Sequence, residues 1–283
     1  MNVIGLGEAG CRISNYLSKY SGYQTFQIDV KNKKYKNFIK IKQHKDHESY
    51  EEHYKPLKIN IVEESDTVLV LCGAGTVSGA VLRILEQLNS NNVKILYIRP
   101  RLSELSSLQV TRHRIVNQVL QEYCRSAKLK EMTIVDNSLV ESLLLDIPLD
   151  DYWAPINQLI GDTFHMINFF RKSSPLLKSN NAIPKTAMVS TYSLVDFSKM
   201  EEKKLYDLSF PRAKSYYFGL GKQFIKENKD ILTQVRKFIS LNESENCDCS
   251  YEIHQTDYEE NYVYGYHHAS FIQDQDKNLF TDQ

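Results

Sequence analysis

The chain has 283 residues, which is enough for one large or two medium-sized domains with a buried core. Hydrophobic residues make up 42% and charged residues 25%, as in ordinary globular proteins, and the apolar runs are too short to span a bilayer. We therefore expect no membrane segment and no signal peptide. Lys and Arg balance Asp and Glu at 35 each, which gives general binding of nucleic acid no electrostatic support. Five scattered cysteines fit a reducing cytoplasm better than a disulfide framework, so we expect a cytoplasmic protein.

The first 150 residues alternate between short apolar runs, which predict strands, and amphipathic stretches, which predict helices. The expected strands cover residues 2–4, 25–28, 67–71, 93–98 and 132–135, and the expected helices cover 12–19, 81–88 and 108–129. The strands are mostly continuous apolar runs, as is typical of strands buried on both faces. This order predicts a doubly wound, mainly parallel α/β sheet, in which ligands bind at the carboxyl ends of the strands.

Residues 31–58 interrupt the alternation with a segment rich in Lys, His and Tyr. Its acidic residues, among them Asp46 and Glu48, partly balance the lysines. The balance favours a solvated excursion, with one edge strand at residues 38–42, over a specific anion-binding role.

The character of the sequence changes after a long amphipathic helix, which we expect at residues 152–170 with Pro155 in its first turn. Tyrosine-rich, β-like segments follow at residues 187–195, 214–218 and 249–266, with a helical stretch at 227–241. Such segments indicate a mixed or antiparallel sheet. The sequence thus predicts an α/β domain at residues 1–150, a connecting core helix at 151–172 and a smaller α+β domain at 173–283.

A glycine-rich turn follows the first expected strand and reads Gly5-Leu6-Gly7-Glu8-Ala9-Gly10. Glycines let a backbone approach phosphate oxygens closely, and the amides at the start of the next helix attract negative charge. Asp29 ends the second strand, so the segment also satisfies the dinucleotide fingerprint, in which an acidic residue contacts the ribose. A NAD-type oxidoreductase or a dinucleotide sensor is therefore one hypothesis.

A second glycine-rich turn follows the apolar run at residues 67–72 and reads Gly73-Ala74-Gly75-Thr76-Val77-Ser78-Gly79. Its amides, with the hydroxyls of Thr76 and Ser78, suit terminal phosphates or a bound Mg²⁺. No Gly-Lys-Ser/Thr sequence follows either turn, so neither turn is a P-loop. A dinucleotide has one pyrophosphate, which the first turn already serves, so a second turn favours a nucleoside di- or triphosphate.

Together these segments resemble the tubulin/FtsZ superfamily of GTPases. The second turn is similar to the family loop Gly-Gly-Gly-Thr-Gly-Ser/Thr-Gly, with Ala74 and Val77 in place of two glycines, and the first resembles the family's first phosphate-binding loop. Three later segments match in the same order: Tyr97-Ile98-Arg99-Pro100, Ile134-Val135-Asp136-Asn137-Ser138-Leu139 and Asn157-Gln158-Leu159-Ile160. The resemblance covers residues 1–172, and the short chain is similar to compact tubulin-like proteins of bacteriophages and plasmids. A phage origin would place it in the host cytoplasm.

The resemblance implies that the chain binds GTP or GDP, with Mg²⁺ as a candidate companion ion, and that chains associate head to tail into filaments. It assigns phosphate contacts to the two turns. The residues concerned are Gly7, Glu8, Ala9, Gly10 and Cys11 in the first, and Gly73, Ala74, Gly75, Thr76, Val77, Ser78 and Gly79 in the second. Pro100 precedes the sugar-binding loop, Asp136 or Asn137 would contact the ribose, and Asn157 the guanine.

Two departures from the family pattern bear on activity. Cys11 and Arg12 stand where the family usually has an Asn that contacts guanine. Active relatives carry an acidic loop after the core helix, whereas residues 163–195 contain no Asp or Glu. Since a carboxylate normally polarises the attacking water, we expect weak or absent GTP hydrolysis and assign no catalytic residue. A structural protein that keeps the fold without a nucleotide is the remaining hypothesis.

Cys247-Asp248-Cys249 is a further pair of potential metal ligands, but His254 is the one other candidate nearby. We expect this segment to be a loop or the start of a strand rather than a metal site.

Overall fold

The computed structural model describes residues 1–62, 65–88, 92–179 and 188–273. These residues form two compact units, unit 1 mainly from residues 1–161 and unit 2 mainly from residues 162–270. In the described part of the chain, no helix combines the length and the hydrophobicity needed to cross a membrane.

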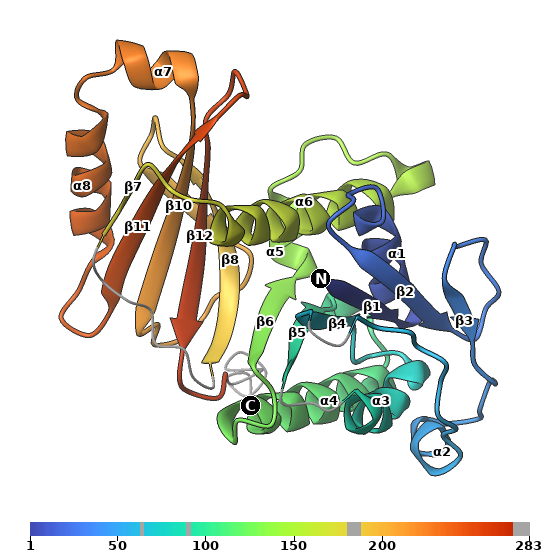
Figure 1. Cartoon of the computed structure of the whole chain (residues 1–283). Helices are drawn as coiled ribbons and strands as arrows, with labels where there is room; N and C mark the ends of the chain where they lie inside the picture. The colour runs from blue at the N-terminus through green and yellow to red at the C-terminus, as the bar shows by residue number, and fades with distance from the viewer. Residues whose placement is uncertain (63–64, 89–91, 180–187, 274–283) are drawn as a thin grey trace. The chain divides into compact units, whose positions relative to one another are not determined.

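Unit 1 contains a parallel sheet with the strand order β3–β2–β1–β4–β5–β6 (Figure 1). The strands are β1 (Asn2–Leu6), β2 (Gln24–Asp29), β3 (Phe38–Lys40), β4 (Thr67–Leu71), β5 (Val93–Arg99) and β6 (Glu131–Asp136). Every residue of β1, β4 and β6 is buried, because helices cover the sheet on both faces. The prediction of a doubly wound parallel sheet is confirmed.

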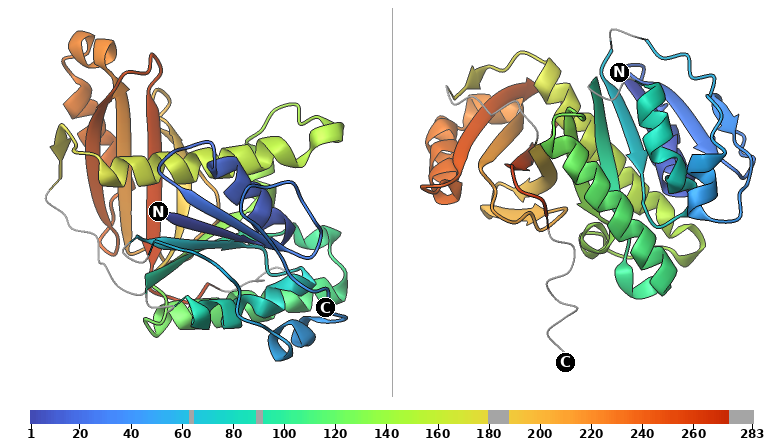
Figure 2. Two further views of the ribbon diagram at one scale, coloured as in Figure 1. Left: turned by 45° about the vertical axis from the view of Figure 1, so that its right-hand side comes forward. Right: turned by 90° about the horizontal axis from the view of Figure 1, so that it is seen from below.

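Helix α1 (Gly7–Leu17) lies on one face of this sheet, and α3 (Val81–Gln87) and α4 (Ser107–Arg125) lie on the other (Figures 1 and 2). Helix α4 begins with a capping box, in which the Ser106 hydroxyl accepts from the Gln109 amide and the Gln109 side chain accepts from the Ser106 amide. The remaining short elements of unit 1 are α2 (His47–Glu52), α5 (Asn137–Ser142) and the 3₁₀ turns η1 (Thr76–Ala80), η3 (Leu102–Glu104) and η4 (Leu149–Asp151).

Three helix boundaries differ from those that the sequence predicts. Helix α1 begins five residues before the predicted residue 12, because Gly7 at φ 71° turns the chain directly from β1 into the helix. Helix α4 ends at Arg125 rather than at residue 129, and the left-handed Ala127 follows its end. The predicted helical stretch at 227–241 is interrupted, with α7 (Lys222–Glu227) ending where it should begin and α8 (Ile231–Asn242) following.

Unit 2 contains a mixed sheet with the order β9–β8–β12–β10–β11–β7, in which β10 and β11 are parallel. Its strands are β7 (Leu177–Lys178), β8 (Met188–Asp196), β9 (Glu201–Lys204), β10 (Ala213–Gly221), β11 (Asp248–Thr256) and β12 (Tyr262–Ala269). The mixed character agrees with the prediction. The predicted β-like segment at 249–266 forms two strands, separated by a turn.

Helices cover both faces of the β10–β11–β12 region. Successive side chains of β10 point to opposite faces of the sheet, so they pack against different helices. Tyr216 and Phe218 pack with Phe238 of α8, while the intervening Tyr217 stacks on Phe170. Phe170 belongs to α6 (Trp153–Lys172), whose residues from Asp162 onward lie in unit 2. A Cβ at Gly219 would lie 2.5 Å from Cζ of Phe170, so the close approach of α6 requires glycine there.

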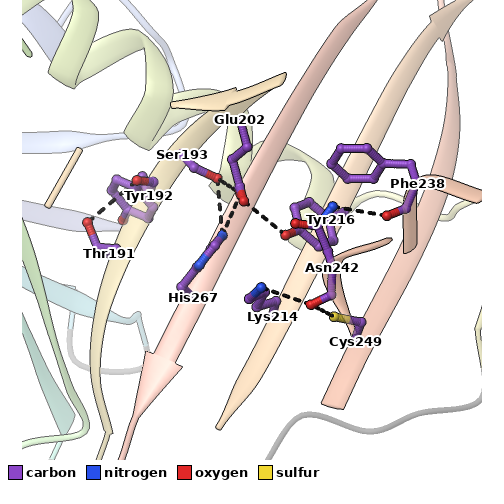
Figure 3. Close-up of polar contacts among 10 residues, drawn as sticks. All are labelled: Thr191, Tyr192, Ser193, Glu202, Lys214, Tyr216, Phe238, Asn242, Cys249 and His267. Atoms are coloured by element: carbon purple, nitrogen blue, oxygen red, sulfur yellow. Dashed lines mark hydrogen bonds and ion pairs between the residues drawn. The ribbon is translucent and has the colours of Figure 1, made fainter. Parts of the chain in front are cut away.

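A buried polar network joins β8, β9, β10 and β12 in unit 2 (Figure 3). The Glu202 carboxylate accepts a hydrogen bond from Ser193 at 2.5 Å and from Tyr216 at 3.2 Å, and it lies 2.6 Å from Nε2 of His267. Burial alone would raise the pKa of Glu202, but the hydrogen bond and charge of His267 outweigh burial, and the pKa is lowered. The carboxylate is therefore held in its charged form inside the unit.

Candidate functional site

The carboxyl ends of four neighbouring strands of unit 1 carry almost all of the residues that the sequence singled out. Leu6 at the end of β1 pairs with Leu71 at the end of β4, and Leu71 pairs with Tyr97 of β5. Arg99 of β5 in turn pairs with Asp136 of β6. Because the strands are parallel, the two glycine turns, Pro100 and Asn137 all leave the sheet at the same edge.

Asn157 comes to this unit on α6, which packs against α1. A Cβ at Gly161, one turn after Asn157, would lie 2.6 Å from the ring of Tyr16. The Asn157 side chain is buried and its Nδ2 donates to the Trp153 carbonyl at 2.6 Å. Its contact with a guanine stays a prediction.

The glycines of the first turn serve two different purposes. A Cβ at Gly5 would lie 2.2 Å from the Gly10 carbonyl oxygen, and a Cβ at Gly10 would lie 2.2 Å from the Val70 carbonyl oxygen. These two glycines allow α1 to pack tightly on β1 and β4. Gly7 adopts φ +71°, and a Cβ there would meet nothing within 4 Å, so the backbone at Gly7 borders open space.

The second turn shows the same division. A Cβ at Gly73 would lie 2.3 Å from the hydroxyl of Tyr97, and one at Gly79 would lie 1.9 Å from the carbonyl oxygen of His47. Gly75 is exposed, and a Cβ there would meet nothing within 4 Å. The turn is therefore packed from behind at its two ends and open at Gly75.

The helices that follow the two turns have no side-chain cap, although the Gly73 and Ala74 amides of the second turn donate to the side chains of Tyr97 and Cys72. Neither α1 nor η1 receives a capping hydrogen bond from a side chain, whereas α2, α4 and α5 are capped by Asp46, Ser106 and Asp136. The first amides of a helix lack partners within the helix, and the helix dipole places positive charge there. Two adjacent, uncapped helix starts that border open space suit an anionic ligand.

Ser78 holds the second turn in shape. Its Oγ lies 2.9 Å from the Gly73 carbonyl oxygen, 2.7 Å from the Gly75 carbonyl oxygen and 3.2 Å from Nε2 of His47. Three hydrogen-bonding partners, two of them carbonyls of the turn itself, thus surround this hydroxyl. This arrangement favours a structural role for the Ser78 hydroxyl over a contact with phosphate. The side chains of Ala74 and Val77 are buried, so these residues can offer a ligand only their backbone, and Thr76 is partly exposed.

A buried pair of side chains supports the turn from below. The Tyr97 hydroxyl lies 2.7 Å from Nδ1 of His113, on α4. Burial lowers the pKa of His113 to about 3, with Arg99 and Arg114 adding to the effect, so the imidazole is neutral at pH 7. Neither this pair nor His47 was predicted, because both contacts join segments that are distant in sequence. The one local signal was Asp46, a residue type that caps helices, which indicates that a helix begins at His47. It does not indicate that this helix packs against the second turn.

Cys11 and Glu8 differ in how they are held. The Cys11 thiol donates to the carbonyl of Ile28 at 3.4 Å, and burial raises its pKa to about 12, so the side chain is a protonated part of the core. The Cys11 side chain is therefore not available to a ligand. Glu8 is exposed and forms an ion pair with Arg12 at 2.8 Å, and the hydrogen bond from Arg12 lowers the pKa of Glu8.

The structure distinguishes between the two candidate ribose contacts. One carboxylate oxygen of Asp136 accepts from the Ser138 amide at 2.7 Å, and the other pairs with Arg99. The Oδ1 atom of Asn137 is buried and has no hydrogen-bond partner among the described residues. The Asp136 carboxylate is thus engaged as a helix cap, and the Asn137 acceptor is unpaired but buried, so the contact of either residue with a ribose stays a prediction.

Two observations bear on the alternative hypotheses. Asp29, the residue on which a dinucleotide site would depend, is buried and accepts from the Val30 amide at 2.8 Å. After α6, the described residues 173–179 contain no acidic side chain, and residues 180–187 lie outside the described part of the chain. Among the described residues, no group of three or more His, Cys, Asp or Glu could hold a metal ion.

Comparison with solved structures shows which fold this is. The chain is similar to an FtsZ dimer from M. jannaschii, with 11% identity, a TM-score of 0.67 and coverage of 95% of this chain and 87% of that chain. It is also similar to TubZ of Bacillus thuringiensis serovar israelensis in GDP-form protofilaments, with 13% identity, a TM-score of 0.66 and coverage of 94% and 86%. A type III plasmid segregation TubZ matches with 13% identity, a TM-score of 0.64 and coverage of 96% and 88%.

No protein-family model and no curated protein matches the sequence. The structural similarity, at identities this low, shows the fold alone. The predicted resemblance is confirmed at that level.

Proposed function

We propose that this chain, a divergent protein with the tubulin/FtsZ fold, binds a guanine nucleotide in unit 1 and self-associates head to tail, with little or no GTP hydrolysis. The observation that carries the proposal is that Gly7 and Gly75, at two neighbouring and uncapped helix starts, each border open space. The amides at these helix starts would hold phosphates, because the helix dipoles place positive charge there.

The other predicted contacts complete the nucleotide site. Asn137 would accept a hydrogen bond from the ribose, Pro100 would border the sugar, and Asn157 would contact the guanine edge. Mg²⁺ prefers oxygen ligands and would accompany the phosphates through the Thr76 hydroxyl. The solved TubZ protofilaments in GDP form provide a precedent within the same fold for a guanine nucleotide.

The nucleotide is tested by extracting what copurifies with the full chain and by thermal unfolding with added GTP, GDP, ATP or NAD(H), each with Mg²⁺ or with a chelator. A ligand at about 100 times its dissociation constant adds about 2.7 kcal/mol to the free energy of unfolding. We expect GTP and GDP to raise the melting temperature. Stabilisation by NAD(H) instead would support the dinucleotide hypothesis, and no stabilisation by any nucleotide would support a fold without a ligand.

Self-association is supported by two exposed surfaces of opposite charge. The acidic leucine surface, in unit 1, comprises Leu145, Leu149, Asp150, Asp151 and Trp153, and its two leucines are 91% and 93% exposed. The basic leucine surface, in unit 2, comprises Lys172, Leu176, Leu177 and Lys178. We propose that these exposed leucines lie in an interface between copies of the chain.

The two surfaces suit a heterologous contact between copies of the chain. The acidic surface of one copy would meet the basic surface of the next, and such a contact builds open filaments unless rotation closes it. Solved filament structures of TubZ provide a precedent for self-association in this fold. Pelleting and negative-stain microscopy with GTP test the proposal, and a chain that stays monomeric at high concentration would refute it.

Weak hydrolysis follows from the absence of acidic residues at positions 163–195. No side chain there can polarise a water molecule as a carboxylate does. We expect phosphate release close to the uncatalysed background at protein concentrations that give filaments. Rapid, filament-dependent release would contradict this part of the proposal.

A further inference from the structure

Two of the five cysteines lie together in unit 2, at the entry to β11. Cys247 and Cys249 are separated by one residue of nearly extended chain, so their side chains lie on the same side of it. The two thiols form a hydrogen bond with each other. Neither Cys247 nor Cys249 is part of a disulfide, so both sulfurs are at the thiol level.

A lysine and a helix end surround this pair (Figure 3). Lys214 lies opposite Cys249 in the β10–β11 register. The Lys214 ammonium donates to the carbonyl oxygen of Asn242 at 2.9 Å, and the Cys249 thiol donates to the same oxygen at 3.3 Å. Asn242 is the last residue of α8, so the Cys249 proton helps to satisfy the end of that helix.

The environment distinguishes Cys247 from the other four thiols. When Cys247 ionises, the single Cys249 proton can turn from the Asn242 carbonyl to the Cys247 thiolate, and this hydrogen bond lowers the pKa of Cys247, with Lys214 contributing, although burial opposes the shift. Burial raises the pKa of Cys11 and Cys124 to about 12 and that of Cys72 to about 11. The hydrogen bond to Cys247, together with burial, also raises the pKa of Cys249.

A small reagent has a short path to Cys247. This residue is 5% exposed, but the four residues that precede it, 243–246, are all exposed. Two backbone hydrogen bonds between Ser244 and Cys247 close this turn, at 3.0 and 3.4 Å. Opening a turn held by so few bonds costs far less than unfolding the unit.

We propose that Cys247 and Cys249 form a redox-active dithiol, which a hydroperoxide oxidises to an intramolecular disulfide. The Cys247 thiolate attacks one peroxide oxygen, the O–O bond breaks, and the departing hydroxide takes a proton to leave as water, which gives a sulfenic acid at Cys247. Cys249 then attacks that sulfur, the S–O bond breaks, and the hydroxyl leaves as a second water with the Cys249 proton. One peroxide is reduced by two electrons for each disulfide that forms.

Oxidation has a structural consequence at α8. The disulfide removes the proton that Cys249 donates to Asn242, so the helix end keeps only the Lys214 ammonium as its partner from this cluster. The last turn of α8 should therefore exchange its amide hydrogens faster in the oxidised protein than in the reduced protein.

The test treats the reduced full chain with one equivalent of hydrogen peroxide and maps the product by peptide mass spectrometry. We expect the peptide that contains both cysteines to lose the mass of two hydrogen atoms. Cys249→Ser should stop at the sulfenic acid, which a dimedone probe traps at Cys247, and Cys247→Ser should block the reaction. The rate should rise with pH as Cys247 ionises, and it should do so at a lower pH than an ordinary thiol requires, because the pKa of Cys247 is lowered.

Cys72→Ser is the matched control, because Cys72 is the most exposed of the other cysteines and its pKa is raised. This variant should form the disulfide at the rate of the unmodified chain. Oxidation of Cys72 before Cys247, or thiols at 247 and 249 that react only after denaturation, would overturn the proposal. If Cys249→Ser does not fold, dimedone is added to the unmodified chain during the first seconds of oxidation. Trapping at Cys247 would then support the proposal, and no trapping there would refute it.

Discussion

Gly75→Val offers a way to remove the proposed phosphate contact without disturbing the fold. Gly75 has φ −76° and ψ 152°, an extended conformation that any residue adopts, and an added Cβ would meet no atom within 4 Å. We therefore expect a change of less than about 0.5 kcal/mol in the free energy of unfolding without ligand. The valine methyl groups would fill the space in which a phosphate is expected.

The ligand-dependent stability gives the size of the effect. GTP at about 100 times its dissociation constant adds about 2.7 kcal/mol, and about 2–4 °C of melting temperature accompany each kcal/mol in a protein of this size. The unmodified chain should thus gain about 5–11 °C with saturating GTP. A hundredfold loss of affinity in Gly75→Val would reduce the gain at the same GTP concentration to about 1–2 °C.

Gly73→Ala provides the contrasting control for this experiment. Its Cβ would lie 2.3 Å from the Tyr97 hydroxyl and 3.0 Å from Val116, so we expect a loss of about 1–3 kcal/mol without any ligand. Differential scanning fluorimetry with and without GTP separates the two behaviours. The reasoning fails if Gly75→Val keeps the full stabilisation by GTP, because the ligand would then lie elsewhere.

Three further variants test other parts of the structure. Gly7→Ala should lower the free energy of unfolding without ligand by about 1–2 kcal/mol, because φ +71° is unfavourable for alanine. Urea denaturation measures this change, and an unchanged free energy of unfolding would show that the turn is not strained. Glu202→Gln should cost about 1–3 kcal/mol at pH 7. Because the pKa of Glu202 is lowered by folding, its contribution is complete above its ordinary value of 4.5 and is lost as the pH falls through the folded value, so the difference between the two proteins should shrink in acid. Asp150→Lys with Asp151→Lys should abolish pelleting with GTP, whereas unchanged filaments would exclude the acidic leucine surface from the interface.

The sheet of unit 1 could be predicted because its strands are buried on both faces. A short, continuous apolar run between two turns, such as residues 67–71, is typical of such a strand, and β4 occupies that range without change. The glycine turns then had to follow the strands at their carboxyl ends. The fold of unit 1, with both glycine turns at one edge of its sheet, could therefore be predicted from local sequence alone.

The segments that escaped prediction owe their structure to contacts with distant residues. Helix α2, with six residues, is too short to form by its own propensity, and it exists because its Asp46 cap and its packing on η1 hold it. The edge strand β9 carries the sequence Glu201–Lys204, which has no apolar pattern, and it pairs with β8 while Glu202 enters the buried network. Neither the packing of α2 on η1 nor the pairing of β9 with β8 can be predicted from the residues next to them in the sequence.

A glycine motif in a sequence cannot distinguish a glycine that packs from a glycine that faces a ligand, but the geometry here can. Gly5, Gly10, Gly73 and Gly79 are required because protein atoms lie where a side chain would be, and Gly7 and Gly75 border open space. Ala74 and Val77, the two residues that stand where the resembling family loop has glycines, are both buried. Their side chains therefore need not obstruct a phosphate, and the degenerate loop is compatible with binding because substitution has occurred at positions where only the backbone would meet the ligand.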